Sequence, residues 1–154
     1  MSKSSSNRPA PARAVNRKAT FSYHLLKKYV AGMVLQGTEV KAIRLGQANL
    51  KDAYCYFAQG GLWVQGLHIS TYKPAGPFNH EPERPRKLLL HKQELAKLRS
   101  QQQLRGHTIV PLRLFLSPRG WVKLEIALAQ GKKLYDKRAS VKERELARQL
   151  RATR

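Results

Sequence analysis

The stretch that decides the fold is residues 110–128, which read VPLRLFLSPRGWVKLEIAL. Apolar residues alternate with other residues in both halves, which is the pattern of strands that bury one face. Residues 117–120 supply the turn between the halves. The apolar face predicted for this hairpin consists of Val110, Leu112, Leu114, Leu116, Val122, Leu124, Ile126 and Leu128. We expect the hairpin to form one wall of an antiparallel barrel.

A second hairpin is predicted upstream, at residues 54–59 and 62–69. Both runs are rich in aromatic and β-branched residues, and the Gly60-Gly61 pair between them is a strong turn signal. Gly66 is expected to mark a β-bulge, and residues 33–36 add a short apolar strand. Together these strands predict a mainly β fold, a small closed antiparallel barrel of the oligonucleotide-binding type.

Two or three helices are expected at the periphery of this barrel. Thr20 can cap a first helix over residues 20–30, whose apolar face would be formed by Leu25, Leu26, Tyr29 and Val30. A short helix is predicted for residues 37–46 and another for residues 92–104. The proline-rich segment 73–87 is expected to be a loop, and its length suggests a functional role.

The two ends of the chain are expected to lie outside this domain of residues 16–130. Residues 1–15 are rich in Ser, Pro and Ala, contain no acidic residue and predict a disordered segment. Residues 131–154 carry nine basic and three acidic residues with almost no apolar material. Ser140 and Glu143 form a capping box, so this tail is expected to be disordered alone and to become helical on a partner.

The composition favours a polyanionic partner. Thirty Lys and Arg residues oppose nine Asp and Glu residues, which gives a net charge of +21. Such self-repulsion is tolerated when a polyanion neutralises it, and nucleic acid is the leading candidate. An anionic membrane surface is the rival partner, but there is no signal peptide and no long apolar run.

The composition offers little material for catalysis. Cys55 is the only cysteine, so no intrachain disulfide is expected and a reducing cytoplasm is the predicted location. The five histidines are scattered without metal-ligand spacing, and carboxylates are few. We therefore expect no metal, no cofactor and no active site; a nuclease would need clustered carboxylates or a His pair.

Several basic residues lie beside the ends of predicted elements and form a candidate RNA surface: Arg17, Lys18, Lys41, Arg44, Arg86, Lys87 and Lys123. Any one of them alone could be an ordinary solvated charge. Glu39 either pairs with Lys41 and Arg44 or accepts hydrogen bonds from a guanine edge or a ribose hydroxyl. The aromatic residues that could stack on bases or fill the barrel wall are Tyr23, Tyr54, Tyr56, Trp63 and Trp121.

These motifs occur together in one known family. The matching segments are residues 16–19 with Tyr23, 31–32, 35–41 with Arg44, 46–50, 84–90, 131–133 and 136–138. In these segments the chain resembles the SsrA-binding protein (SmpB) family. It departs from the family at Lys27, Lys28 and Val30, where many members carry acidic residues, and at Ala42-Ile43, which replaces a common Ser-Leu.

The resemblance implies a non-catalytic bacterial factor, monomeric when free. It would bind the tRNA-like domain of transfer-messenger RNA and take it to ribosomes stalled on truncated messages. The barrel would hold the RNA, with Glu39 and Asn49 joining the basic residues above. The tail would lie as a helix in the decoding site and the empty messenger channel, through Lys132, Lys133, Asp136, Lys137, Arg138, Lys142 and Arg144. A general ribosome-associated or nucleic-acid-packaging protein is the alternative.

Overall fold

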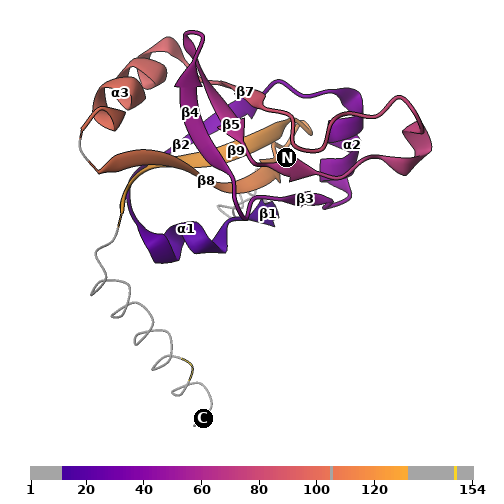
Figure 1. Ribbon diagram of the computed structural model, residues 1–154, viewed down its shortest axis with the longest axis horizontal. Coiled ribbons are helices and arrows are strands. Elements are labelled where there is room, and N and C mark those ends of the chain that lie inside the picture. The colour runs from indigo at the N-terminus through magenta and orange to yellow at the C-terminus, as the bar shows by residue number, and fades with distance from the viewer. Residues whose placement is uncertain (1–11, 105, 132–147, 149–154) are drawn as a thin grey trace, which may run out of the picture.

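The computed structural model describes residues 12–104, 106–131 and 148 (Figure 1). Residues 1–11 of the segment predicted to be disordered lie outside the described residues, but residues 12–15 form a strand, so the prediction is wrong for those four. The helix predicted for the tail lies almost entirely outside the described residues.

The described chain is built mainly of strands. In chain order the elements are β1 (Ala12–Val15), α1 (Arg17–Ser22), β2 (Tyr23–Met33), α2 (Gly37–Arg44), β3 (Ala48–Asn49), β4 (Tyr54–Ala58), β5 (Gly61–Gln65), β6 (His68–Ile69), the 3-10 turn η1 (Lys73–Ala75), β7 (Arg86–Leu89), α3 (Lys92–Gln102), β8 (His107–Leu116) and β9 (Val122–Gly131). The short helix predicted at 37–46 and the helix predicted at 92–104 are confirmed as α2 and α3.

Seven of the strands form one antiparallel sheet in the order β1-β8-β9-β2-β7-β5-β4, and β3 pairs separately with β6. The predicted hairpin of residues 110–128 is confirmed as β8 and β9, which lie near the centre of the sheet. Its turn is closed by a hydrogen bond from Ser117 N to Trp121 O, 2.8 Å long. The mainly β class predicted from the sequence is confirmed by these two sheets.

The closed barrel predicted from the sequence is wrong, because the sheet is open. Closure requires the two edge strands to exchange hydrogen bonds, but within the described part of the chain β1 pairs only with β8, and β4 pairs only with β5. The sheet curls far enough to bring β4 into contact with β8. Side chains of α1 and of residues 51–53 line a cavity at the opening between these strands. The seam therefore stays open as a surface feature.

The single apolar face predicted for residues 110–128 is interrupted by a bulge. The register of β8 shifts between Pro111 and Arg113, where the strand has one extra residue. An extra residue reverses the alternation of side chains. Val110 and Leu112 therefore pack with α1 on one face, whereas Leu114 enters the main core on the other face. The prediction was wrong for Val110 and Leu112.

The helix predicted over residues 20–30 is also wrong, since α1 ends at Ser22 and the rest belongs to β2. The register of β2 against β9 shifts between Leu25 and Lys27. As a result Leu25 packs beside α1, while Tyr29 enters the main core. A strand with this bulge places apolar residues four positions apart, which imitates helical spacing.

The hairpin predicted around Gly60 and Gly61 is confirmed as β4 and β5. Gln59 and Gly60 have φ values of +50° and +72°, so both turn residues adopt the left-handed region that such hairpins require. The strand predicted for 62–69 is split at Gly66, whose φ is +79°. A Cβ there would lie 2.6 Å from Asp52 O, so the close approach of these two backbones requires glycine. The short strand predicted for residues 33–36 is wrong, because β2 ends at Met33 and residues 34–36 are not in a strand.

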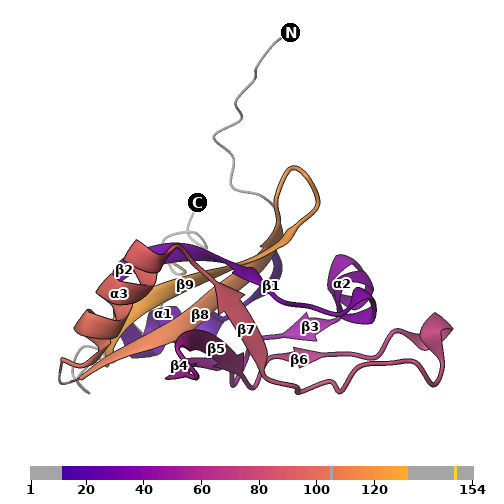
Figure 2. The same cartoon turned by 90° about the horizontal axis from the view of Figure 1, so that it is seen from above.

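Two apolar clusters stabilise the fold. The main core lies between the curved sheet and two helices, with Ile43 from α2 and Leu98 from α3 fully buried in it. A smaller cluster holds α1 against the sheet through Ala19, Val110, Leu112, Ala127 and Ala129. Figures 1 and 2 show α2 and α3 at opposite ends of the body. The described residues include no helix that is long and apolar enough to cross a membrane.

Candidate nucleic-acid interface

A buried ionic cluster fixes α2. The Glu39 side chain is fully buried and its Oε1 accepts a hydrogen bond of 2.8 Å from Gln36 N, closing the N-terminal turn of the helix. Its Oε2 lies 2.6 Å from Arg86 Nε, and Arg84 Nη2 bonds to Oε1. Arg86, also fully buried, donates further to the carbonyl oxygens of Leu67 and Pro82. The cluster thus joins α2 to the chain segment that leads into β7.

The charges of this cluster compensate one another. Burial by itself raises the pKa of Glu39, but the hydrogen bond from Gln36 N and the guanidinium groups of Arg84 and Arg86 outweigh it, so the pKa is lowered. Burial lowers the pKa of Arg86, and the Glu39 carboxylate opposes that shift. The carboxylate is therefore held ionised between two cations.

This geometry decides between the two interpretations of Glu39 offered by the sequence. Glu39 is an ion-pair partner, as one of them held, but its partners are Arg84 and Arg86 rather than Lys41 and Arg44. Since Glu39 and Arg86 are both 0% exposed, neither side chain reaches the surface in this structure. The role of Arg84 was missed, although its position two residues before Arg86 was a usable signal.

The outer side of α2 is exposed and basic. Lys41 Nζ lies 5.3 Å from the centre of the Tyr72 ring, a cation–π contact. Arg44 Nη2 lies 3.5 Å from Gly120 O, at the turn between β8 and β9. We call Lys41, Arg44 and Tyr72 the α2 surface. Beyond α2, the exposed Asn49 accepts a hydrogen bond from Lys51 N through its side-chain oxygen.

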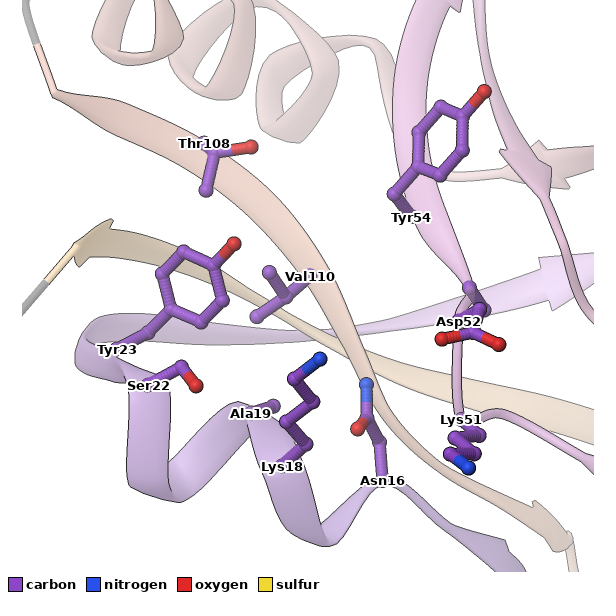
Figure 3. Close-up of a pocket in the computed structure, with 11 residues that line it drawn as sticks. Asn16, Lys18, Ala19, Ser22, Tyr23, Lys51, Asp52, Tyr54, Thr108 and Val110 are labelled. Carbon is purple, nitrogen blue, oxygen red and sulfur yellow. The ribbon is translucent and has the colours of Figure 1, made fainter.

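A cavity of about 280 Å³ lies at the open seam of the sheet (Figure 3). Lys18 and Tyr23 line it from the side of α1, and Lys51, Asp52 and Tyr54 line it from the side of β4. We call it the seam pocket. Its lining combines aromatic rings with ammonium groups and a carboxylate, which is the set of groups that can stack on a base, contact a phosphate and bind a base edge.

Asn16 holds the floor of the seam pocket in place. It is 7% exposed, its Nδ2 donates to Pro111 O over 2.9 Å, and its backbone N donates to Leu112 O over 2.7 Å. These bonds attach the start of α1 to the bulge in β8. The position of Lys18 thus depends on the same bulge that the sequence pattern did not reveal.

The remaining predicted residues lie apart from these two surfaces. Arg17 lines a cavity of about 360 Å³ with Lys28, Arg113 and Glu125. Lys123 lines another of about 350 Å³ with Val30, Leu89, Leu90, His91 and Glu94. Lys87 is exposed on β7 with its side chain over Gly61. The structure therefore distributes the predicted basic residues over several patches of the body instead of one face.

The predicted aromatic residues occupy two kinds of position. Trp63 is partly buried and donates to Ala58 O over 3.0 Å, and Tyr56 is also partly buried. Trp121 is 69% exposed and Tyr54 is 52% exposed. Of these four rings, only those of Trp121 and Tyr54 are open to water, and Tyr23 is partly buried in the lining of the seam pocket. Where the structure describes the chain, no three metal-ligating side chains of His, Cys, Asp or Glu gather into a cluster.

The fold and these surfaces define a class: a small basic β protein whose exposed cations and aromatic rings suit a polyanion. The comparison with protein families is more specific, because the model described as SmpB protein matches residues 13–154. The chain belongs to the SmpB family.

Individual relatives support this assignment. An SsrA-binding protein of Phocaeicola vulgatus is 50% identical over 143 residues, which cover 93% of this chain and 95% of the relative. One of Trichodesmium erythraeum is 55% identical over 131 residues, covering 84% and 83% of the two chains. A solved chain, described as "tmRNA-SmpB: a journey to the center of the bacterial ribosome", is similar to this chain with a TM-score of 0.68 and 37% identity. The alignment covers 87% of this chain and 95% of the solved one.

Proposed function

We propose that this protein is an RNA-binding adaptor that binds the tRNA-like domain of transfer-messenger RNA and delivers it to stalled ribosomes. The observation that carries the proposal is 50% identity to an SsrA-binding protein over nearly the full length of both chains. The basic α2 surface and the seam pocket agree with it. The protein acts in the cytoplasm by binding, and the proposal assigns it no chemical step.

The body of residues 16–130 grips the RNA in this proposal. Phosphates are contacted by the exposed cations, which are Arg17, Lys18, Lys41, Arg44, Lys87 and the partly exposed Lys123, and Asn49 adds a polar contact. The buried Glu39 and Arg86 act indirectly, because they fix the helix that carries Lys41 and Arg44.

The tail of residues 131–154 is proposed to bind ribosomal RNA in the decoding site and messenger channel. The residues assigned to this task are Lys132, Lys133, Asp136, Lys137, Arg138, Lys142 and Arg144. All of them lie outside the described residues, so the proposal rests on the sequence and the family. Its charge and its lack of apolar residues fit a segment that orders on RNA.

The decisive experiment is a titration of the purified full-length protein with the tRNA-like domain, in the presence of duplex DNA as competitor. An adaptor binds the tRNA-like RNA with a strong preference over the duplex, and one tRNA-like species copurifies with it from cells. If heterogeneous RNA copurifies, and if duplex DNA displaces the tRNA-like RNA from the protein, the packaging alternative is favoured instead.

A truncation separates the body from the tail. The protein cut after Gln130 is expected to fold and to bind tRNA-like RNA at moderate salt, while tagging of stalled chains is lost. Neutralising Asp136, Lys137 and Arg138 together removes one negative and two positive charges. A large loss of tagging in that variant could not come from bulk electrostatics. Tagging that survives both changes would leave the tail as a solvated basic end.

A further inference from the structure

Phe78 is exposed to water, and the loop that carries it is held together by several hydrogen bonds. Its side chain is 85% exposed, more than any other large apolar side chain among the described residues. It lies between β6 and β7, in the segment that extends past α2 at the end of the body away from α3 (Figures 1 and 2). None of the contacts described so far uses this ring.

The loop around Phe78 is tied together by polar contacts. The Asn79 side chain accepts a hydrogen bond from Tyr72 N at 2.7 Å and donates to Tyr72 O and Gly76 O, each at 2.9 Å. The backbone N of Phe78 donates to Ala75 O over 3.1 Å. The segment of residues 72–79, which we call the Phe78 loop, is therefore a closed turn with a defined shape.

The Phe78 loop is also attached to α2. His80 is buried, donates through Nε2 to Ile69 O at 2.9 Å, and shares a hydrogen bond of 2.8 Å between its Nδ1 and the Thr38 hydroxyl. The ring of Tyr72 lies under Lys41 Nζ. The loop and α2 thus form one continuous structure, and a ligand bound at Lys41 lies next to the loop.

From this arrangement we propose that the Phe78 loop is an additional RNA-contacting element, in which the Phe78 ring stacks on an unpaired base of the RNA bound at the α2 surface. An aromatic ring whose face is open to water can stack on any base. Lys73 at the start of the loop and Lys41 beside it can contact the adjoining phosphates. The exposed Glu81 and Glu83 follow the loop, so the phosphates are assigned to the lysine side.

The proposal rests on the proposed RNA-binding function and adds a residue to it that the sequence analysis did not single out. A protein partner with an apolar pocket is the competing occupant. The neighbouring lysines favour RNA, since a stacked base brings its phosphate close to a cation, whereas an apolar pocket gains nothing from Lys41 and Lys73.

The test uses the full-length protein, a transcript of the tRNA-like domain, and three variants, Phe78→Ala, Phe78→Leu and Phe78→Trp. Leu104→Ala is the matched control, because Leu104 is 58% exposed just beyond α3, at the opposite end of the body. We expect Phe78→Ala to weaken binding roughly 5- to 150-fold, the range for loss of one stacked base. Phe78→Leu should be nearly as weak, because leucine is apolar but has no π face. Phe78→Trp and Leu104→Ala should bind like the unmodified protein.

Chemical probing of the RNA gives the second readout. One unpaired base that the unmodified protein protects should become reactive in the complex with Phe78→Ala and stay protected with Phe78→Trp. Unchanged affinity and unchanged protection with Phe78→Ala would overturn the inference, as would full binding by Phe78→Leu. Loss of ribosome association with intact binding of the tRNA-like RNA would place the partner of the ring on the ribosome and also overturn the inference. Failure of the unmodified protein to bind the RNA would instead overturn the proposed function.

Discussion

The two helices that carry the proposed RNA contacts both pack apolar side chains against the body, but only α2 is also fixed by a buried ion cluster. At one end, α2 packs Ile43 into the main core and is fixed in addition by a carboxylate buried between two guanidinium groups. On the other side, the six-residue α1 is fixed by small apolar side chains and by the amide of Asn16. Glu39 and Arg86 were predicted to contact RNA, but both are buried in this cluster. They position the helix that carries the contacts.

The two attachments differ in what happens when one member is lost. A buried ion pair is costly to break, because the remaining charge is left without water or a counter-ion. A small apolar cluster loses one set of contacts and the others remain. We therefore expect α2 to fail as a unit, whereas α1 should loosen by increments.

The largest effect is predicted for Glu39→Gln, which keeps the size of the side chain and removes its charge. Arg84 and the fully buried Arg86 would then lack a counter-ion, and the free energy of unfolding should fall by about 3 to 5 kcal/mol. Chemical denaturation at pH 7 measures this. Glu125→Gln is the control, since Glu125 and Arg113 are partly exposed with 3.4 Å between their charged atoms; such pairs contribute about 0 to 1 kcal/mol. Equal losses in the two variants would refute the difference between buried and exposed pairs.

The same carboxylate predicts how stability depends on pH. The folded protein lowers the pKa of Glu39, so ionised Glu39 contributes stability above the pKa of the unfolded chain, about 4.3 for a glutamate. That contribution is lost as the pH falls through the lower folded value. The difference in unfolding free energy between the unmodified protein and Glu39→Gln should therefore be constant from pH 7 to about 5 and shrink below about 4. A difference that stayed constant below pH 4 would show that charge is not its source.

The sequence was sufficient for elements whose local signals agree. The Gly60 turn and the hairpin of residues 110–128 were predicted because turn chemistry and strand patterning agree there, and α2 was predicted because its flanking glycines agree with the helical spacing of its apolar residues. The open seam was not predictable in this way. It depends on which edge strands meet, and that is a long-range property set by the curl of the sheet and by α1.

Bulges explain the main local errors. One extra residue in β2 and another in β8 reverse the side-chain alternation, so a strand imitated a helix and one apolar face became two. The candidate site shows the same limit, since charge in the sequence cannot tell a buried guanidinium from an exposed one. Arg86 and Lys87 are neighbours in the chain, yet the first is fully buried and the second is exposed.

The next effect in size concerns the attachment of α1. Asn16→Ala removes the donor to Pro111 O and leaves this buried carbonyl without its partner, which should lower the free energy of unfolding by about 1 to 3 kcal/mol. Asn49→Ala is the control, because Asn49 is exposed and surface substitutions usually change stability by less than about 0.5 kcal/mol. A loss as large as that of Glu39→Gln would mean that the two helices are attached equally firmly, and the comparison would fail.

The smallest effect separates contact from position. Lys18→Ala and Lys41→Ala change exposed side chains on α1 and α2, so the free energy of unfolding should stay the same while RNA binding weakens less than about tenfold at 0.1 M salt. If each lysine contacts one phosphate, the plot of log affinity against log salt should become shallower by about 0.7 to 0.9 for each variant. Lys97→Ala on the outer side of α3 provides the control, with no change in slope expected.

Glu39→Gln should behave differently from Lys41→Ala. The Glu39 variant should lower the melting temperature and the RNA affinity together, because it displaces α2 and removes no direct contact with the RNA. If Glu39→Gln weakens RNA binding and leaves the melting temperature unchanged, Glu39 contacts the RNA directly, and the interpretation from its burial is wrong.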